Sequence, residues 1–553
     1  MLNIMFVFIK ILYFVMFVFC GLGLLYKLQC NFYMINYILK DDVVTLKKQI
    51  FLLLTFLIID VLIFAINLFC IELLIALLFL KLILLFITID DKKIIKKIKF
   101  TKRIARLFFT YVFFTLLFVI LVSFANDLIQ YFVFNFTYLI SIAFVILSML
   151  IIYPIDKIIE RYFVNLAKSK LHENDDLIKI GITGSFGKTS VKEILHSILN
   201  EKYYALKSPK NYNTTFGVTK TINEFLNSRH EVFICEMGAN RRGDITKLCN
   251  IVDIDCGIVT AVGRQHTNTF GGIDNVYLAK KELADYLRYK PCVFNLMNRY
   301  ISKMYHNYRG SKYGIYICCN RELNSKRILK FSLNKYVKTE SLKLFKFYEY
   351  SRINCFSARK ITLGEICLTF DLWFQNEYLC RIESSLIGLH NVINILLAIA
   401  MSRILDVDIM DIKSGVKSIT SIGARFEKHV GANGAIIINN GYNSNLDSAV
   451  WTLKSLNLYN RPNKVVITPG LIDCEDSYKY NYDFGQLVAK YATEIIITKN
   501  VNKKAIRDGL KDAGFDMGKV SFADSFDDVK TLITTLNVNY VVLIENDLPD
   551  NYK

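Results

Sequence analysis

The stretch from Gly181 to Ser190, which reads G-I-T-G-S-F-G-K-T-S, constrains the fold of this chain more than any other. The apolar run I-K-I-G-I-T leads into a glycine turn that carries Lys188 and Thr189, and a helical pattern follows. Glycines let backbone N–H groups turn toward phosphate oxygens, a lysine reaches the β/γ-phosphates, and a hydroxyl at the helix start can hold Mg²⁺. The segment therefore predicts a strand, a phosphate-binding loop and a helix.

The match to a P-loop is incomplete. The strict pattern requires a glycine five residues before Gly187, and Ile182 stands there instead. The chain has the shorter form T-G-S-x-G-K-T-S. A glycine-rich turn from strand to helix with an incidental lysine is the alternative interpretation.

Hydrophobic residues make up 53% of the 553 residues, and nearly all of the excess lies before Asp156. The apolar runs there are long enough for membrane helices, which need about 20 residues each. A signal peptide is the alternative for the first run, but Lys10 interrupts it and no A-x-A-like cleavage site follows. We expect five spans, at about Ile4 to Tyr26, Ile50 to Phe69, Ile71 to Ile89, Leu107 to Ala125 and Tyr131 to Tyr153.

The charges of the short loops predict an orientation. Residues 90–106 contain eight lysines and arginines, whereas residues 126–130 contain none. The basic loop is expected in the cytoplasm, and with five spans everything after Tyr153 lies there too. We therefore expect a multi-pass protein of the cell membrane with its catalytic domains in the cytoplasm.

The chain has a net charge of +19, and many of its basic residues lie in loops beside the predicted spans. We therefore expect membrane lipid, through its anionic headgroups, to be the partner of these residues. Nucleic-acid binding is not expected. The 13 cysteines form no C-x-x-C pair, which fits reduced thiols and argues against a zinc ribbon.

From Ile178 onward, short β-branched runs alternate with helical patterns, which is typical of a mostly parallel α/β sheet. Residues 321–387 change to antiparallel strand patterns, and a long amphipathic helix is expected over 391–405. A second α/β unit with Rossmann-like spacing begins near Gly423. The expected fold is a multi-pass α-helical membrane region followed by α/β, with a P-loop ATPase-like central domain and a Rossmann-like C-terminal domain. The expected boundaries are 1–155 for about five transmembrane helices, 156–177 for a linker, 178–422 for the central domain and 423–553 for the C-terminal domain.

Further polar positions follow the predicted strands. Asn211 to Gly217, N-Y-N-T-T-F-G, lies in a polar turn; Glu236 ends an apolar strand, and His266 follows another. Lys280 shares a predicted helix with Glu282. Functional groups collect where parallel strands end, and a carboxylate with an imidazole there can serve a magnesium site. Taken singly, each residue is explained as well by a surface or capping role.

The order and spacing of these segments resemble the Mur ligase family, the ATP-dependent amide-bond ligases of peptidoglycan precursor synthesis. The resemblance runs through T-G-S-F-G-K-T-S, N-Y-N-T-T-F-G, E-M-G-A-N-x-x-G-D-I, the histidine before F-G-G, A-K-x-E, G-L-H-N-V-x-N, G-A-R-F-E and Y-N-S-N. It covers about Ile178 to Ser448.

The resemblance implies a site for ATP and two magnesium ions. The implied catalytic residues are Lys188, Lys280 and His266. The implied metal site consists of Thr189, Glu236, His266 and Lys280. Lys280 would join the metal site when it is carbamylated, as it is in some family members. Asn211, Asn213 and Gly217 belong to a family motif. The resemblance implies that His390 helps to complete the nucleotide pocket and that the loop at Tyr442 arrives from the C-terminal lobe as it closes. The implied ATP-binding residues are Gly184, Ser185, Gly187, Lys188, Thr189, Ser190, Asn295, Asn391, Asn394, Arg425, Asn443 and Asn445.

The implied activity is a membrane-anchored ligase that joins a carboxylate to an amine through an acyl phosphate, of the D-alanyl-D-alanine-adding type. The substrates implied are amino-acid, peptide or lipid-linked cell-wall precursors, with envelope-synthesis proteins as partners. Asn439-Asn440 stands where the family usually has an acidic pair, Met297-Asn298 departs from a common Asn-Ala-Asp-Asp run, and no K-G-S-R-type segment ends the chain. A poly-γ-glutamate synthetase, another envelope-polymer ligase and a nucleotide-binding scaffold without turnover stay open as alternatives.

Overall fold

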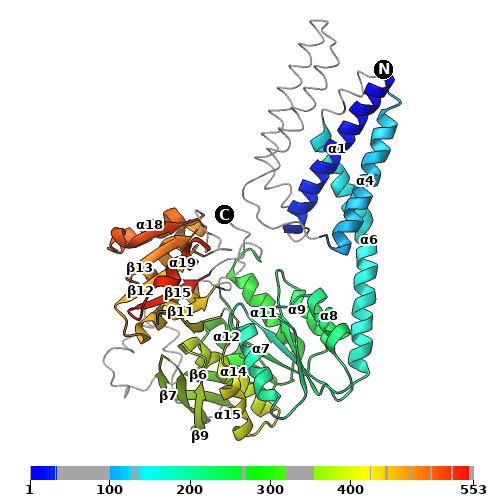
Figure 1. Ribbon diagram of the computed structural model, residues 1–553. Coiled ribbons are helices and arrows are strands. Elements are labelled where there is room, and N and C mark those ends of the chain that lie inside the picture. Colours follow the sequence, from blue (N-terminus) through cyan, green and yellow to red (C-terminus); the bar gives the residue numbers. More distant parts are fainter. Residues whose placement is uncertain are drawn as a thin grey trace. The chain divides into compact units, whose positions relative to one another are not determined.

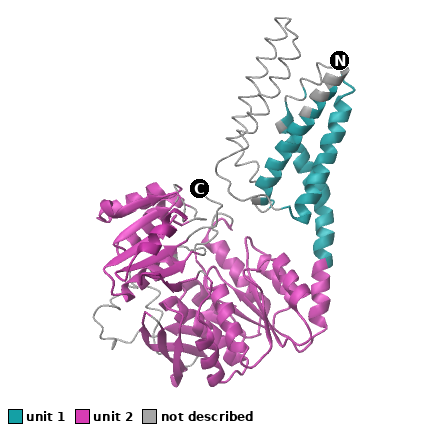
Figure 2. Ribbon diagram, in the orientation of Figure 1, with its two compact units in different colours: residues 1–162, 550–553 teal, residues 163–549 magenta. Residues whose placement is uncertain are grey.

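The structure is a computed structural model of the chain, and it divides into two compact units (Figure 2). The first unit holds residues 1–162 with 550–553, and the second holds 163–549. The residues described are 2–30, 33, 100–125, 133, 136–263, 270–317, 354–365, 367–423, 425–441, 446–471, 476–498, 501–524 and 527–546.

Three long helices make up the described part of the first unit: α1 (Leu2–Cys30), α4 (Lys102–Val122) and the first part of α6 (Thr137–His172) (Figure 1). Tyr111 of α4 is fully buried among them, and its hydroxyl donates to the carbonyl of Phe17 at 2.7 Å and lies 3.0 Å from Ser141 Oγ. A Cβ on Gly21 would lie 2.1 Å from the Tyr111 ring. Only glycine lets this ring pack against α1.

The prediction of five spans in a multi-pass protein of the cell membrane, with its catalytic domains in the cytoplasm, is wrong. Among the described residues, two helices are long and apolar enough to cross a bilayer, Lys102–Val122 and Leu139–His172. Two such helices are weak evidence, since a buried core helix passes the same test. The shorter apolar helix at the N-terminal end is Tyr13–Gln29. The spans predicted at 50–69 and 71–89 lie outside the described residues.

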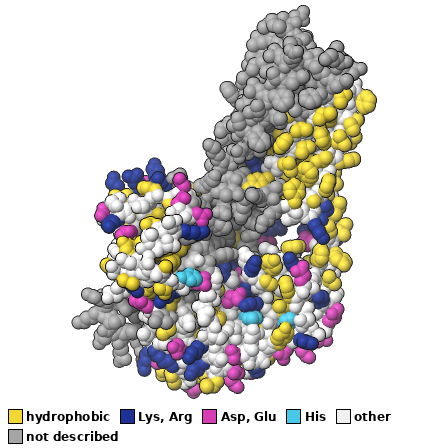
Figure 3. Space-filling model, in the orientation of Figure 1, with side chains coloured by type: hydrophobic (Ala, Val, Ile, Leu, Met, Phe, Trp, Pro, Cys, Tyr) yellow, Lys and Arg dark blue, Asp and Glu magenta, His cyan; other side chains and the backbone are white. Residues whose placement is uncertain are grey.

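The physical reason for the error is that an apolar run is also what a helix needs to pack against another helix. Leu24, Leu25, Leu107 and Val145 form one buried cluster with Tyr111. Hydrophobic side chains also gather on the outer surface of the described helices of this unit, as the yellow atoms of Figure 3 show. Composition alone therefore cannot separate the two cases.

The second unit contains a nine-stranded sheet in the order β2-β3-β1-β4-β5-β6-β7-β8-β9. Neighbouring strands from β2 to β7 are parallel, and β8 and β9 are antiparallel to their neighbours, as the sequence patterns predict. The strands are β1 (Ile178–Thr183), β2 (Ala205–Lys207), β3 (Val232–Met237), β4 (Cys256–Val259), β5 (Cys292–Asn295), β6 (Lys312–Ile317), β7 (Cys355–Leu363), β8 (Leu368–Phe374) and β9 (Glu377–Ser384).

Helices cover both faces of this sheet, because its central strands alternate apolar side chains between two buried clusters. In β3, Val232 and Ile234 pack in one cluster, and Phe233 and Cys235 pack in the other. The first cluster includes α7 (Lys188–Leu199), α14 (Leu389–Ile404) and α15 (Ile409–Ser418), and the second includes α8 (Thr215–Phe225), α9 (Asp244–Val252), α11 (Ile273–Leu287) and α12 (Arg299–Asn307).

The helix predicted over 391–405 is α14, but it is not amphipathic in its surroundings. Asn391, Val392 and every residue from Asn394 to Ser402 are buried. The helix packs between the sheet and α7, so no face of it is left for water.

A second sheet of six strands follows, in the order β10-β11-β15-β12-β13-β14. It is parallel except for β10, and helices cover both of its faces. This arrangement agrees with the predicted α/β fold. Its elements are β10 (Glu427–Val430), β11 (Ile436–Asn440), α16 (Leu446–Ser455), η3 (Leu456–Leu458), β12 (Asn463–Thr468), α17 (Ser477–Val488), β13 (Glu494–Thr498), α18 (Lys503–Asp512), η4 (Met517–Lys519), β14 (Val520–Ala523), α19 (Asp527–Thr535) and β15 (Tyr540–Glu545). The predicted domain boundaries stay predictions.

Candidate functional site

The phosphate-loop sequence forms a tight turn between β1 and α7. Gly184 has φ +152° and Gly187 has φ +82°, values that glycine adopts without strain. A Cβ on Gly184 would lie 2.0 Å from Thr260 Oγ1, and one on Gly187 would lie 2.9 Å from Asn394 Oδ1. Both glycines are therefore required by conformation and by space.

The turn is fixed to the end of β4. The N–H of Ser185 donates to the carbonyl of Ala261 at 2.7 Å, and Ser185 Oγ accepts from the N–H of Gly263 at 3.1 Å. Thr260 Oγ1 donates to the carbonyl of Phe186. Ser190 follows in the first turn of α7 and is buried. A loop held at so many points is already organised for a ligand.

Lys188 is folded back over its own turn. Its Nζ donates to the carbonyls of Gly184 at 2.7 Å and Ser185 at 3.4 Å. Burial lowers the pKa of Lys188 below its ordinary value; the charge of Glu236 opposes that shift and the charge of Arg425 adds to it. Arg425, from the segment before β10, thus acts on the same site, where two cations repel each other.

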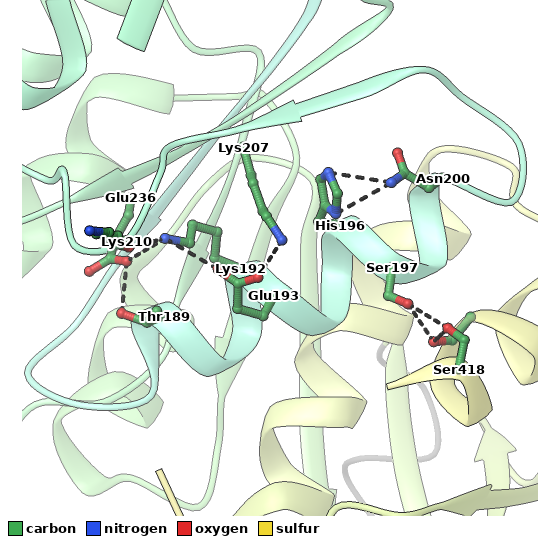
Figure 4. A network of polar contacts seen from close by, with 11 residues as sticks. Thr189, Lys192, Glu193, His196, Ser197, Asn200, Lys207, Lys210, Glu236 and Ser418 are labelled. Carbon is green, nitrogen blue, oxygen red and sulfur yellow. Dashed lines mark hydrogen bonds and ion pairs between the residues drawn. The ribbon is translucent and has the colours of Figure 1, made fainter. Parts of the chain in front are cut away.

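Glu236 is the buried carboxylate of the site, and three side chains hold it (Figure 4). Its Oε2 accepts from Thr189 Oγ1 at 2.8 Å and lies 3.3 Å from Lys192 Nζ. Its Oε1 accepts from Asn213 Nδ2 at 3.1 Å. Burial alone would raise the pKa of Glu236, but Lys188 and Lys192, with the hydrogen bonds from Thr189 and Asn213, hold it below its ordinary value.

Strand register explains why Thr189 and Glu236 meet. Strands β1 and β3 are parallel, and Ile182 pairs with Glu236 one residue before the end of each strand. Glu236 follows Val232 and Ile234 at the two-residue period, so it faces the side of the sheet that α7 covers. The strand that feeds the phosphate loop therefore has the carboxylate beside it.

The polar turn at Asn211 to Gly217 reaches the site through Asn213. Its carbonyl accepts from the N–H of Gly238 at 2.7 Å, and a Cβ on Gly238 would lie 2.8 Å from Asn213 Cγ. Gly217 is buried in the first turn of α8, where a Cβ would lie 2.9 Å from Tyr212 Cα. Asn211 is exposed. Of the motif residues, Asn213 contacts Glu236 directly.

Lys280 and Glu282 share α11 but differ in surroundings. Lys280 is 4% exposed, and no described residue makes a hydrogen bond or ion pair with its ammonium group. Burial, with the charge of Lys188 adding to it, lowers its pKa to about 7. Glu282 instead caps α9: its carboxylate accepts from the N–H of Gly243 at 2.7 Å and from the N–H of Thr246 at 3.0 Å.

Two of the predicted nucleotide asparagines, Asn295 and Asn391, bind neighbouring backbone, and Asn394 binds the side chain of Asn391. Asn295 Nδ2 donates to the carbonyl of Thr260 at 2.8 Å. Asn391 Nδ2 donates to the carbonyl of Ile387 at 2.8 Å, and Asn394 Nδ2 donates to Asn391 Oδ1 at 3.2 Å. Asn394 therefore lies against Gly187 of the phosphate loop, whereas Asn295 joins β5 to the end of β4.

His390, the second residue of α14, lies half-buried beside Phe426, with ring centroids 5.0 Å apart. Burial lowers its pKa to about 4, so the imidazole is neutral at physiological pH. Its Nδ1 has no hydrogen-bond partner among the described residues. Four predicted positions, His266, Tyr442, Asn443 and Asn445, lie outside the described residues. Within the described ranges, no three histidine, cysteine, aspartate or glutamate side chains form a metal-ligand cluster.

Lys192 is a site residue that sequence reasoning missed. It is fully buried, and its Nζ donates to the carbonyl of Lys210 besides contacting Glu236. The spacing in the sequence could have pointed to Lys192, because it follows Lys188 by four residues and both lysines therefore lie on one face of α7.

The site thus combines a strand-to-helix phosphate loop with a buried carboxylate at the ends of neighbouring parallel strands. Residues 182–402 match the family model described as Mur ligase middle domain. The chain thus resembles the Mur ligase family, as its motifs predict.

Among curated relatives, the chain is similar to UDP-N-acetylmuramoyl-tripeptide–D-alanyl-D-alanine ligases. It is 39% identical to that of Treponema pallidum over 107 residues, 19% of this chain and 23% of the relative. It is 24% identical to that of Bacillus subtilis over 315 residues, 56% of this chain and 60% of the relative. The chain therefore spans less than two thirds of the length of these relatives.

Among solved structures, MurF from Acinetobacter baumannii superposes with a TM-score of 0.57 at 20% identity, covering 70% of this chain and 77% of that one. MurF from Thermotoga maritima in complex with ADP gives 0.56 at 20%, covering 70% and 80%. These likenesses establish the α/β fold.

Proposed function

We propose that this protein is an ATP-dependent, ADP-forming ligase that joins a carboxylate to an amine, of the D-alanyl-D-alanine-adding type in peptidoglycan precursor synthesis. The observation that carries the proposal is the contact between Thr189, which follows the loop lysine, and the buried carboxylate of Glu236 at 2.8 Å. A hydroxyl and a carboxylate at the start of a phosphate-loop helix suit a nucleotide that arrives with a divalent cation.

In this proposal the phosphates lie over the turn at Gly184 to Gly187, where backbone N–H groups and the N-terminus of α7 face them. Lys188 leaves the carbonyls of Gly184 and Ser185 and moves to the phosphate oxygens. This exchange is favourable because a carbonyl carries a partial charge, whereas a phosphate oxygen carries a full one.

Thr189 and Glu236 fit a magnesium ion. Both present hard oxygen atoms, and magnesium keeps several waters of its own, so one protein carboxylate and one hydroxyl suffice. When bound, the ion offsets the repulsion between the substrate carboxylate and the phosphate it attacks. A second ion would use His266 and Lys280.

Lys280 fits carbamylation, which converts its amine into an anion. A neutral amine is the reactive form toward carbon dioxide, and a pKa of about 7 leaves a large share of Lys280 neutral at physiological pH. We expect the carbamate signal after labelling with ¹³C-bicarbonate to appear in the ¹³C NMR spectrum of the protein and to be lost in Lys280→Ala. In Lys281→Ala, which changes the half-buried neighbour paired with Asp285, the signal should remain.

The remaining predicted nucleotide groups take supporting places. Asn394 touches the loop glycine, and Arg425 approaches Lys188 from the C-terminal lobe. Within the described part of the chain, Nδ1 of His390 has no hydrogen-bond partner. We propose that Arg425 contacts the phosphates once they are present, because a polyanion between two cations replaces their repulsion with attraction. Asn295 and Asn391 would line the adenosine side.

The substrates are proposed from the similarity to the D-alanyl-D-alanine ligases. A substrate carboxylate attacks the γ-phosphate to give an acyl phosphate and ADP, and the amine nitrogen of the dipeptide then displaces phosphate to form the amide. Lys188 stabilises the charge on the phosphoryl group during transfer. The carboxylate donor is a muramoyl tripeptide, carried either on UDP or on a lipid.

The test is phosphate release by the purified full-length protein given ATP, Mg²⁺, D-alanyl-D-alanine and one of the two tripeptide donors. We expect release that depends on both substrates, with the amide product seen by mass spectrometry. Lys188→Ala should lower kcat/KM by at least about 100-fold, as loss of a phosphate-stabilising group does. Lys207→Ala is the matched control, since Lys207 lies near α7 without contacting Glu236. Release with glutamate alone would favour a poly-γ-glutamate synthetase, and ATP binding without release under any pair would favour a scaffold.

A further inference from the structure

Lys192 is the strongest feature of the site that the proposed reaction leaves unused. Its side chain is fully buried on α7. Its ammonium group donates to the carbonyl of Lys210, lies 3.3 Å from Glu236 Oε2 and lies 3.6 Å from Glu193 Oε1 (Figure 4). These acceptors come from a loop, from a strand and from α7 itself.

Burial of an ammonium group is costly unless its donors are satisfied. Lys192 donates one hydrogen bond, to the Lys210 carbonyl, and two carboxylate oxygens, of Glu236 and Glu193, lie within ion-pair distance of its ammonium group. The charges also balance locally, because Lys192 and Lys207 face Glu193 and Glu236. The side chain is thus held in one place rather than left free to move toward a phosphate.

The contact with Lys210 makes Lys192 an anchor for the loop 208–214. Lys210 has φ +48°, a left-handed conformation that needs support from its surroundings in a residue other than glycine. Three residues later, Asn213 donates to the second oxygen of Glu236. Lys192 therefore reaches the carboxylate twice, directly at Oε2 and through the loop at Oε1.

We propose that Lys192 is a positioning residue: it fixes Glu236 and the loop 208–214 in the geometry that binds the cation and its nucleotide. This inference rests on the proposed function, which puts a divalent cation at Glu236. Lys192 itself touches neither the nucleotide nor the reacting atoms. The loop lysine, Lys188, moves to the phosphates, whereas Lys192 stays on its three oxygens.

The first test measures the binding of Mn²⁺ with ADP, by electron paramagnetic resonance, to the full-length protein. Lys192→Met should weaken this binding by about 10- to 100-fold, as loss of a group behind a metal ligand does. Lys192→Arg, which keeps the charge and the donors, should recover most of the affinity. Lys207→Met removes a lysine of the same cluster that does not contact Glu236, and it should change the affinity for Mn²⁺ with ADP by less than about 2-fold. Unchanged or tighter binding in Lys192→Met would overturn the inference.

The second test needs neither metal nor nucleotide. Hydrogen exchange reports on the N–H groups of Ser208, Tyr212 and Gly238, which donate to the carbonyls of Ile234, Pro209 and Asn213. We expect them to exchange at least about 10-fold faster in Lys192→Met and at the wild-type rate in Lys207→Met. Equal rates in Lys192→Met and wild type would contradict the anchoring of the loop.

A further pair of variants covers the case in which Lys192→Met does not fold. Removal of Lys192 leaves the Glu236 carboxylate without its paired charge, and Glu236→Gln removes that carboxylate. The double variant Lys192→Met, Glu236→Gln should therefore fold. Faster loop exchange in the double variant than in Glu236→Gln alone supports the anchor, and equal exchange refutes it. If the wild-type protein binds no Mn²⁺ with ADP, the proposed function fails, whereas the exchange experiment still decides the role of Lys192 as an anchor.

Discussion

At the scale of single residues, the main feature of the site is its positive charge, which comes mostly from lysines. Lys188, Lys192 and Lys280 act on a region whose buried carboxylate is Glu236, and Arg425 adds a further positive charge. The charges of Lys188 and Arg425 each lower the pKa of a neighbouring lysine, so these cations repel one another in the absence of a ligand. A triphosphate removes this repulsion, and the site therefore favours a polyanion.

Lys280 gives a prediction for stability against pH. Its folded-state pKa of about 7 lies below the ordinary value of 10.5, so the unfolded chain binds a proton that the folded protein releases between these values. Folding therefore carries a penalty that is largest below pH 7 and disappears as pH rises toward 10.5. We expect Lys280→Met to stabilise the protein below pH 7, by at most about 5 kcal/mol from the size of the shift.

Urea unfolding across this pH range, in buffer free of carbon dioxide, measures the effect. Lys281→Met is the control, because that neighbouring lysine is less buried and paired with Asp285. A stabilisation by Lys280→Met that does not fade above pH 9 would contradict the pKa assigned to Lys280.

At the scale of elements, α11 supports α9. Glu282 accepts from two N–H groups at the start of α9, so Glu282→Ala leaves both without their acceptor. We expect a loss of about 1–2 kcal/mol in the free energy of unfolding, as for other N-terminal caps. Glu282→Gln, which keeps an acceptor oxygen, should lose less. Faster hydrogen exchange confined to residues 243–247 would identify the cap as the cause, and unchanged exchange there would exclude it.

The order of elements in the second unit could be predicted because each one leaves a local pattern. The runs around Ile180, Ile234 and Ile258 are β-branched and short, and the glycines and Lys188 mark the turn into α7. The burial of α14 could not be predicted, because it depends on α7 and the sheet that enclose it.

The contacts within the site could also not be predicted from the sequence. Asn213 and Thr189 meet Glu236 across 23 and 47 residues, and both contacts depend on which strands neighbour β1. Lys192 escaped notice because a lysine on a helix usually faces water. In the first unit, the apolar runs suggested membrane spans because a packed helix and a spanning helix share one composition.

At the scale of the whole molecule, the two units should respond differently to a ligand. The phosphate loop and Glu236 both belong to the second unit. ADP with Mg²⁺ at 100 times its Kd should stabilise that unit by about 2.7 kcal/mol, since only the folded site binds it. In hydrogen exchange, protection should rise within 163–546 and stay constant in 2–30 and 100–125. Equal protection of both units would show that the ligand acts elsewhere.

If Thr189 and Glu236 hold a cation as proposed, their hydrogen bond also affects which cation the site takes. While the bond exists, the two groups satisfy each other, and an ion that both oxygens bind would replace that hydrogen bond. A monovalent ion such as K⁺ has too weak a field to offset that loss in a site with one carboxylate. A small divalent ion offsets it readily. In the proposed site, the resting contact would thus favour a small divalent ion over the abundant cellular potassium.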